Sequence, residues 1–544
     1  MASDNVHELT DLPEVKDDLV HSVETVIEED REVADPGLKR SLKSRHMQML
    51  AIGGVIGPGY FVGIGNGFTN GGPAGLLLGF GIVGILLWVV MQSLAEMAAF
   101  LAVSGSFTNY TSRFVDPAFG FSLGWNYAFL WFGILGAEYN NLGIGMSRLV
   151  GIWLTISHDL LEVRFAKLGI YPCVLAFSYL GVLAFGEAEF ALTAMKLLFI
   201  VAFFLCSILI TSGAIGDQGK IGFKYYSDPG AFADGVSGVF KVFVFAALQY
   251  SGTEMIGLTA GESANPGRDV PKAVRFVFWR VLVVFLGGIF FLSLCVPWND
   301  PTLLSGASKT ARSPFVISFV NAGLPRGGDA VNAIIIITIL SALNGALYVS
   351  SRTVSALAHQ KQAPKFLGHI NKRGVPTYAL IFCNLFGFIS LLNLSSGAGH
   401  VYDWLVNITG VATFITWGGI CLAHLRFRKA LSLQGVSLEE LPFKAAFYPY
   451  GAWIGLCGNL FFIFFQGWTA FLSPFSVEDF FKNYVMIPVF VIMYLGYKFW
   501  NKTKWVDLAT ADLVTGRREM NPEDRLLDIK KIGIGKRILG AFTG

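Results

Sequence analysis

Apolar residues run along this chain in stretches of about 20 between residues 47 and 500, and shorter stretches between them hold most of the charged residues. A bilayer core requires about 20 largely apolar residues for each helical span. The pattern predicts twelve membrane-spanning helices, at 47–66, 75–100, 121–142, 171–186, 190–211, 239–258, 276–297, 330–357, 377–393, 402–424, 452–472 and 483–500. The prediction is an all-α integral membrane protein with both ends of the chain on one side.

Two of the predicted spans contain residues that weaken helices. The first includes AIGGVIGPGYFVGIGNG, residues 51–67, with seven glycines and one proline. Glycines four apart let membrane helices pack closely, which accounts for several of them. The proline at Gly57-Pro58-Gly59 is expected to break the helix instead. Irregular backbone at this depth is tolerated only where protein buries it or where it lines a watery cavity, so the break indicates a functional site.

The sixth span is interrupted in a similar place, at Tyr250, Ser251, Gly252, Thr253 and Glu254. Broken helices in corresponding positions of two five-helix halves are typical of inverted-repeat transporters, which bind their substrate between the broken segments. Amide groups at the starts of half-helices favour a carboxylate, and carbonyl groups at their ends favour an ammonium group. The pattern predicts a carrier of a zwitterionic amino acid.

Composition and charge support a membrane protein and describe its two ends. Hydrophobic residues make up 53% of the chain and charged residues 15%, a more apolar balance than that of soluble domains. Residues 1–45 hold 12 acidic and 6 basic residues and no signal-peptide core, so we expect a retained, disordered arm. Residues 46–500 form the predicted membrane domain and 501–544 a polar tail. Both ends are potential sites for regulatory partners.

Basic residues predict the orientation. Sixteen Lys and Arg residues, from Lys39 to Lys444, flank one set of loops, whereas about nine flank the other set. Because Lys and Arg resist crossing the membrane, the first set is expected to be cytoplasmic, together with both termini.

Three charged residues inside predicted spans are candidates for the site. A charge in the middle of a bilayer costs about 2.5–3.5 kcal/mol, so such residues are usually buried, paired and functional. Glu138 is predicted to contact the substrate or to handle a proton, with a structural hydrogen bond as the alternative. Glu254 is predicted to contact the substrate, or else to hold the broken backbone. Lys196 is predicted to load and release a proton, because burial makes its charged form costly; snorkelling to the membrane surface is the alternative.

Other residues carry weaker signals. Asn344, Asn407 and Thr409 are expected either to form polar walls of the site or to make structural hydrogen bonds between helices. The sequence favours neither interpretation. Aromatic residues that border the breaks are candidate gates: Tyr60, Phe61 and Tyr250. The six cysteines lie in apolar spans, where cysteine behaves as a small hydrophobic residue. No Ser-His-Asp set, zinc spacing or nucleotide loop is present, so we expect neither an enzyme nor a cofactor, metal or nucleic-acid partner.

Seven motifs carry a resemblance to a known family: GGPAGLLLGF at 71, VMQSLAEMAAF at 90, GSFTNYTSRFVDPAFGFSLGWNY at 105, FGEAEF at 185, AGESANPGRDVPKA at 260, SSRTVSALAHQKQAPKFLGHINKRGVP at 350 and HLRFRKA at 424. With these motifs the chain resembles the fungal amino acid permeases (YAT family) of the amino acid, polyamine and organocation superfamily. The resemblance implies a LeuT-like fold, in which spans 1–5 and 6–10 are inverted repeats and two helices are additional. It also implies proton-coupled uptake of amino acids across the plasma membrane.

The resemblance also assigns roles to residues. It implies that the first break cradles the substrate carboxylate, here with Ile56, Gly57, Pro58 and Gly59. It implies that the second break, here residues 250–254, faces the ammonium group. In related proton-coupled carriers a lysine of the fifth span replaces a sodium ion and contacts the first break, which implies that role for Lys196.

The chain departs from the family pattern at two of these places. Members usually have Thr between the two glycines of the first break, where this chain has Pro58, which lacks both a hydroxyl group and a backbone donor. The third span usually shows Pro, any residue, Glu, where this chain has Gly136-Ala137-Glu138. These changes make another amine, such as a polyamine or carnitine, a more plausible substrate than in an ordinary member.

Two functions are compatible with the sequence. The first is a secondary active transporter working by alternating access, supported by both breaks, Glu138 and Lys196. The second is a nutrient sensor that keeps the permease fold and signals through its acidic arm and basic tail, which the unusual Pro58 favours.

Overall fold

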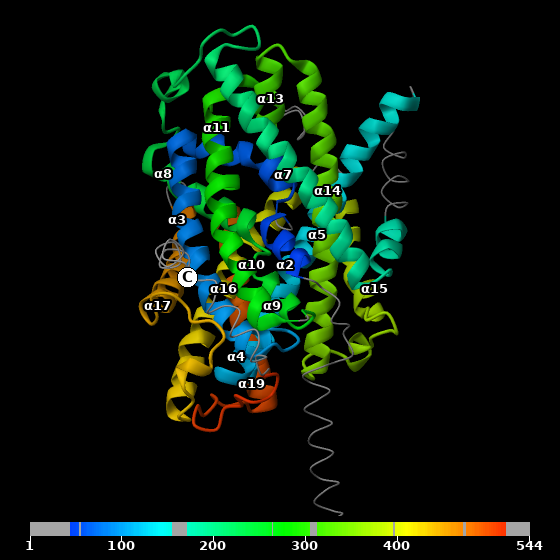
Figure 1. The fold of residues 1–544 in the computed structure, drawn as a ribbon, viewed down its shortest axis with the longest axis vertical. Helices are drawn as coiled ribbons and strands as arrows, with labels where there is room; N and C mark the ends of the chain where they lie inside the picture. Colours follow the sequence, from blue (N-terminus) through cyan, green and yellow to red (C-terminus); the bar gives the residue numbers. More distant parts are fainter. Residues whose placement is uncertain are drawn as a thin grey trace, which may run out of the picture.

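The computed structural model describes residues 44–53, 56–154, 171–263, 265–304, 313–394, 398–471 and 475–517. This part of the chain is a bundle of helices, and its long helices run broadly along the long axis of the molecule (Figure 1). An isolated β-bridge joins Leu101 and Arg517. The predicted all-α architecture is confirmed. The rest of the predicted arm and tail, 1–43 and 518–544, lies outside the described residues.

The first half of the bundle contains the first break and the elements that follow it. Its elements are α2 (Ser44–Gly53), the π-helix η1 (Gly59–Gly63), α3 (Ile64–Phe100), α4 (Phe107–Phe114), α5 (Pro117–Leu154), α7 (Val182–Ser212) and η2 (Tyr226–Gly230). Residues 171–178 are also helical.

The second half begins with the helix before the second break. Its elements up to the loop after the eighth span are α8 (Gly235–Tyr250), α9 (Met255–Ala260), α10 (Pro266–Trp279), the π-helix η3 (Arg280–Gly287), α11 (Gly288–Cys295), α12 (Pro301–Leu304), α13 (Pro314–Asn321), α14 (Pro325–His359) and η4 (Lys365–Gly368). The remaining elements are α15 (Thr377–Leu385), η5 (Phe386–Leu394), α16 (Ala398–Leu433), η6 (Leu438–Glu440), α17 (Tyr450–Phe465), η7 (Trp468–Phe471), α18 (Val477–Tyr484) and α19 (Met486–Asn501).

Helix occupies part of each of the twelve predicted ranges. Five helical segments of the described chain are long and apolar enough to cross a membrane: Gly59–Phe100, Pro117–Tyr139, Val182–Ser212, Pro266–Cys295 and Pro325–His359. A sixth is present if α18 and α19, which meet at 48°, form one span. The multi-pass character is clear from these segments, and the count of twelve remains a prediction.

The boundary between the fourth and fifth spans differs from the prediction. The sequence pattern separates 171–186 from 190–211, but α7 runs unbroken from Val182 to Ser212. The chain breaks earlier, at Gly181, whose φ of 106° suits only glycine. The motif FGEAEF, which we expected at a span boundary, therefore lies inside a helix.

The connection between the first and second spans is also shorter than the pattern predicts. α3 contains the end of the first span and all of the second, and only Gly72 leaves the helical conformation between them. The bend is held by the chain before α8, because Ala74 N donates to Ala231 O at 2.9 Å and Ala233 N donates to Gly71 O at 3.4 Å.

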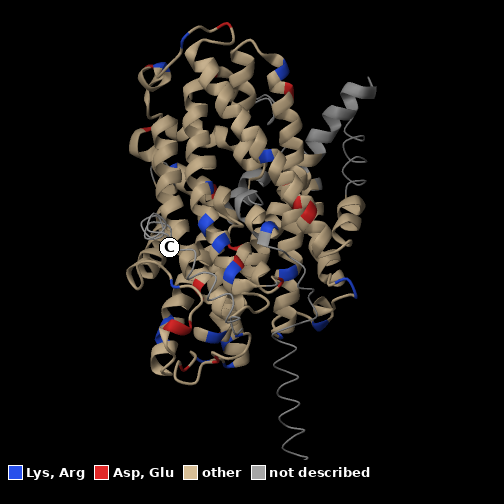
Figure 2. Ribbon diagram, viewed as in Figure 1, with Lys and Arg blue, Asp and Glu red and all other residues tan. Residues whose placement is uncertain are grey.

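The first part of the predicted tail packs against the membrane domain. We call residues 502–517 the strap; it forms the orange-red segment at the bottom of Figure 1. Val506 N donates to Val115 O at 3.0 Å, and Ala102 N donates to Gly516 O at 3.1 Å. Lys and Arg residues gather mainly in the lower half of the same view, the half that contains the strap (Figure 2).

Candidate functional site

The first break lies where the glycines and Pro58 predict it. α2 ends at Gly53, Ile56 and Gly57 are not helical, and helix resumes at Pro58, ahead of η1. Pro58 has helical angles, φ −63° and ψ −23°. Proline is well suited to the first position of a helix, where its missing N–H would have no partner within the helix. Pro58 therefore starts the second half of the span and does not interrupt it. Residues 54 and 55 lie outside the described residues.

The second break is a tight turn between α8 and α9. Ser251 is extended and Gly252 has a φ of 89°, a conformation that favours glycine. The turn is fastened by side chains: Thr253 Oγ1 donates to Tyr250 O at 2.6 Å, and Glu254 Oε1 accepts from Gly252 N at 3.0 Å. Unwound backbone inside a membrane requires such partners.

Glu254 has a second bond that ties this turn to another helix. Its Oε2 accepts a hydrogen bond from Trp417 Nε1 of α16 at 3.0 Å. Both carboxylate oxygens therefore have protein partners, and the side chain is fully buried. This geometry favours the alternative in which Glu254 holds the broken backbone.

The two breaks lie against each other, since α3 packs along α8. A Cβ atom at Gly59 would lie 2.4 Å from Gln249 Nε2, so the carboxamide group of Gln249 packs directly against this glycine. Gln249 is 5% exposed, and among the described residues its carboxamide group makes no hydrogen bond. Ser251 Oγ is likewise buried without a hydrogen-bond partner in the part of the chain that the structure describes.

Gln249 was not among the predicted site residues. A glutamine near the end of a helix is common, so the sequence does not mark Gln249 as a site residue. Gln249 becomes significant because it packs against Gly59 of the first break. The structure adds Gln249 to the residues that line the junction of the two breaks.

The seventh span contacts both breaks through η3. Arg280 donates a hydrogen bond to Thr253 Oγ1 of the second break. Tyr60 of the first break donates from its hydroxyl group to Val284 O at 2.6 Å. The rings of Tyr60 and Tyr250 both pack on Phe285, with centroids 5.1 and 4.8 Å from it. π-Helical turns are frequent at functional sites.

Arg280 was also missed, although its signal was visible: it is a lone arginine in the apolar run FVFWRVLVVF. The candidate gates Tyr60, Phe61 and Tyr250 are all fully buried in this cluster of rings.

Lys196 is buried among polar side chains from two other helices. Its Nζ donates to Ser341 Oγ of α14 at 2.7 Å and lies 3.6 Å from Glu189 Oε1. Ser341 Oγ donates in turn to Glu189 Oε1 at 2.6 Å. The charge of Glu138 on α5 also acts on Lys196. Lys196 and Glu189 are 0% and 1% exposed, so snorkelling of Lys196 to the membrane surface does not occur in this structure.

Glu189 completes this cluster and was not among the predicted site residues. It lies in the FGEAEF motif, and its distance from Lys196 along α7 is two helical turns. Glu189 Oε2 has no hydrogen-bond partner among the described residues. An unpaired carboxylate oxygen in a buried site is a plausible position for a proton.

The remaining predicted wall residues are partly described. Asn344 is buried on α14, one turn from Ser341, and its Nδ2 has no hydrogen-bond partner in the described chain. Thr409 is buried on α16. The side chain of Asn407 lies outside the described residues. Within the described ranges, no group of three or more His, Cys, Asp or Glu side chains could hold a metal ion.

Comparisons with known proteins identify the family. The model of the family described as amino acid permease matches residues 46–509. The chain belongs to the amino acid permease family. The permease is 41% identical to the general amino acid permease AGP3 of Saccharomyces cerevisiae, over 93% of this chain and 90% of that one. It is 40% identical to an uncharacterised amino-acid permease of Schizosaccharomyces pombe, over 89% of this chain and 88% of the relative.

The resemblance found in the sequence motifs is thereby confirmed: the permease is a multi-pass membrane protein that transports amino acids, and it is not an enzyme. Among solved structures, it is similar to a manganese transporter of Eremococcus coleocola, with a TM-score of 0.49 and 12% identity, over 86% of this chain and 98% of that one.

Proposed function

We propose that this permease carries amino acids, or a related amine, into the cell across the plasma membrane by alternating access, coupled to protons. The substrate lies between the breaks of spans 1 and 6, and spans 1–5 and 6–10 are inverted repeats. The observation that carries the proposal is the contact of the two breaks at Gly59 and Gln249. Broken helices that meet in this way are the usual substrate site of repeat-built transporters.

The substrate carboxylate lies beside Gly59, at the start of the second half of span 1, where Ile56, Gly57 and Pro58 precede it. The lack of an N–H group on Pro58 removes one donor from this place. Gln249 offers a replacement, because its amide group reaches the same position and has no hydrogen bond among the described residues. Such a bond to a charged group contributes about 1.5–3 kcal/mol, or roughly ten- to a hundredfold in affinity.

The ammonium group lies toward the end of α8, where residues 250–254 turn away from helical geometry. Ser251 Oγ has no partner among the described residues and can accept from the ammonium group, whereas the unpaired Nδ2 of Asn344 is a donor and suits the carboxylate. Buried polar groups without partners require an explanation, and a bound zwitterion supplies one. Glu254 and Arg280 keep the turn in shape through their bonds to Gly252, Trp417 and Thr253.

The proton is carried by the cluster of Lys196, Glu189 and Glu138. Two carboxylates and one ammonium group share a site that is closed to water and is connected through Ser341 to α14. A buried pair of this kind is costly unless both members are charged or both are neutral. Loading one proton therefore changes the balance between conformations that pack these helices differently.

Uptake assays test the proposal. Labelled amino acids, polyamines and carnitine are offered to cells that lack their own permeases, with and without a proton uncoupler. We expect saturable uptake of amino acids that collapses with the uncoupler. Substrate binding without uptake would contradict transport and would support the sensor.

A further inference from the structure

A pocket of about 880 Å³ lies between the ends of α16 and α17 and the strap, far along α16 from the breaks. Three cationic side chains line it, namely Arg426, Arg428 and Lys429, and none of its lining residues is acidic. The rest of its lining, here called the aromatic wall, is largely aromatic and apolar and includes Trp453 from α17 and Trp505 from the strap.

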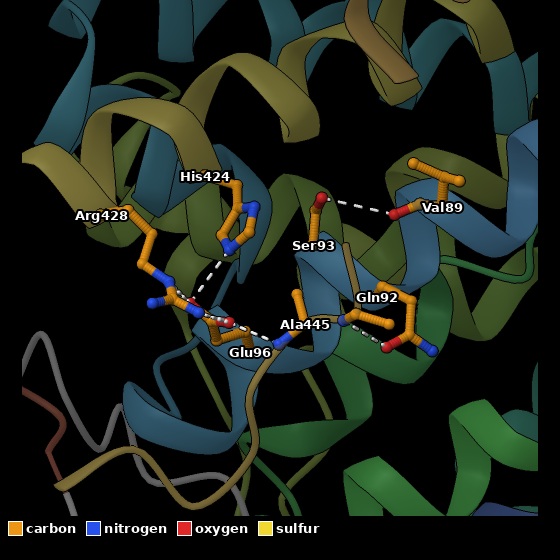
Figure 3. Close-up of polar contacts among 8 residues, drawn as sticks. Val89, Gln92, Ser93, Glu96, His424, Arg428 and Ala445 are labelled. Atoms are coloured by element: carbon orange, nitrogen blue, oxygen red, sulfur yellow. Dashed lines mark hydrogen bonds and ion pairs between the residues drawn. The ribbon is translucent and has the colours of Figure 1, made fainter. Parts of the chain in front are cut away.

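One of the three cations is already neutralised. Arg428 donates through Nε and a terminal nitrogen to both oxygens of Glu96 on α3, the second bond being 2.7 Å long (Figure 3). His424 Nε2 lies 3.0 Å from Glu96 Oε1, and Ala445 N donates to Oε2 at 2.6 Å. These contacts fix the position of Arg428 in the pocket lining. The guanidinium group of Arg428 also lies over the ring of Tyr448, at 4.6 Å from its centroid.

The other two cations have no anionic partner in the part of the chain that the structure describes. Arg426 donates to the backbone carbonyls of Phe114 and Val506, the latter at 2.8 Å, and lies over the Trp505 ring at 5.0 Å. Carbonyl bonds satisfy two of its donors but leave its charge uncompensated, and a guanidinium group has five N–H donors. Lys429 is exposed on the same helix.

The aromatic wall has the composition typical of a boundary between lipid and water. Trp453 and Trp505 are 54% and 56% exposed, and Phe447 and Tyr450 are exposed beside them. Tryptophan and tyrosine side chains gather at the boundary between lipid and water. Further along α17, after Trp453, the exposed face of the helix is apolar, with Ile454, Phe461 and Phe464. The pocket is therefore cationic at its rim and continuous with a surface that suits acyl chains.

We propose that this pocket binds the phosphate group of an anionic phospholipid from the cytoplasmic leaflet. Arg426 and Lys429 contact the phosphate, and the acyl chains lie along α17 beside Trp453. Guanidinium groups bind phosphate oxygens through paired N–H donors. Basic pockets between membrane helices on the cytoplasmic side suit anionic headgroups. A free phosphate compound would use the cations but not the apolar wall.

Binding at this place also affects the strap. Arg426 connects α16 to Phe114 at the end of α4 and to Val506 of the strap. A phosphate that neutralises Arg426 holds these three segments together, because it removes the cost of an unpaired charge. The lipid is expected to stabilise the folded permease.

The test uses the full-length permease purified in detergent. Phosphatidylserine, phosphatidylcholine with the same acyl chains, and glycerophosphoserine without chains are each titrated, and binding is followed by native mass spectrometry and by the unfolding temperature. We expect phosphatidylserine to bind and to raise the unfolding temperature, with the other two compounds much weaker. Equal effects of the two lipids would overturn the proposal, as would equal binding of glycerophosphoserine.

Variants separate the pocket from general surface charge. Lys429→Gln removes an exposed cation without touching the packed core, and we expect about a fivefold loss of affinity for phosphatidylserine. Lys220→Gln is the matched control, since Lys220 is exposed outside the pocket lining. Arg426→Gln should weaken binding further. An unchanged affinity in Lys429→Gln, or an equal loss in Lys220→Gln, would exclude this pocket as the site.

Discussion

The hydroxyl group of Tyr60 donates a hydrogen bond of 2.6 Å to the backbone carbonyl of Val284. Tyr60 lies on η1, directly after the first break, and Val284 lies on η3 of the seventh span. On the same π-helix, Arg280 donates to Thr253 of the second break. The seventh span therefore contacts both broken segments, and a movement of either break requires η3 to adjust.

The contact between Tyr60 and the seventh span is testable by adding one methyl group. A Cβ at Gly288 would lie 1.7 Å from Tyr60 Oη, whereas a Cβ at the adjacent Gly287 would meet only ordinary contacts, with Phe204 at 3.5 Å. We expect Gly288→Ala to displace Tyr60 and to reduce uptake roughly five- to a hundredfold, in line with overpacking costs of about 1–3 kcal/mol. Gly287→Ala is the control and should transport normally. Equal behaviour of the two variants would show that Tyr60 does not position the break.

Removing the hydroxyl group alone should have a smaller effect. Tyr60→Phe keeps the ring packing on Phe285 and loses one hydrogen bond, which contributes about 0.5–1.5 kcal/mol. We expect near-normal surface expression, a modest loss of thermal stability and an altered KM for uptake. A loss of expression instead would mean that Tyr60 acts mainly in folding.

Proton coupling depends on the cluster around Lys196. Lys196→Met alone leaves Glu189 buried without its cation, a change that costs about 3–5 kcal/mol. The double variant Lys196→Met with Glu189→Gln leaves neither charge of this pair, so we expect it to reach the membrane more efficiently than Lys196→Met. It should still fail to accumulate substrate uphill, and its uptake should no longer depend on external pH. Uphill uptake by the double variant would refute the proton role of Lys196.

Glu138 is tested separately, because its charge reaches Lys196 from a different helix. Glu138→Gln keeps hydrogen bonding and removes the charge, and we expect strongly reduced uptake with near-normal surface expression. If Gln is silent and Ala is not, the structural alternative holds.

Substrate selectivity should change at the junction of the breaks. Gln249→Ala removes the carboxamide beside Gly59, and we expect roughly ten- to a hundredfold weaker binding of zwitterionic amino acids. Pro58→Thr returns an N–H and a hydroxyl group to the first break, so it should raise affinity for ordinary amino acids and restore part of the loss in Gln249→Ala. Competition by unlabelled amino acids measures both effects. Unchanged inhibition profiles would mean that the carboxylate binds elsewhere.

Two carboxylates make the strap sensitive to acid. Burial favours a higher pKa for Asp512, but Arg113 and the amide groups of Val514 and Thr515 outweigh it and bring the pKa below its usual value. Burial also opposes ionisation of Asp116, but Lys498, Ala118 N and Thr503 bring its pKa below its usual value as well.

Because both folded-state pKa values are lowered, the carboxylates stabilise the strap fully above the released-state pKa of about 3.9, and their contribution is lost as the pH falls through the folded-state value. We expect a spin label at the exposed position 509 to gain mobility below about pH 4, and Asp512→Asn to raise mobility already at pH 7. A label at position 224, away from the strap, is the control. Equal changes at both positions would indicate general unfolding.

Both breaks could be predicted from the sequence, because glycine and proline affect the backbone wherever they stand. The positions of Gly57, Pro58 and Gly252 therefore had structural meaning before any contact was known. The same is true of Lys196, since a charge in a bilayer is costly in every fold. The motifs were sufficient for the family, which the comparisons confirm.

Other parts of the site depended on contacts between distant segments. Gln249 is significant because Gly59 lies against it, and Glu189 because α7 turns it toward Lys196 and Ser341. The strap could not be predicted, because it is held largely by bonds to backbone carbonyls and amides such as those of Val115 and Val506. Every residue has such groups, so no side-chain pattern reveals which of them will be paired.

The sequence by itself therefore determined that the protein lies in a membrane, that it is helical, where its two breaks are and to which family it belongs. These properties follow from local backbone preferences and from the cost of placing polar groups in lipid. Only the tertiary structure decided that η3 joins the breaks, that Glu254 holds its own turn, and that Arg426 meets the strap. Those contacts depend on the rotation and register of helices far apart in the chain, which packing of the whole bundle sets.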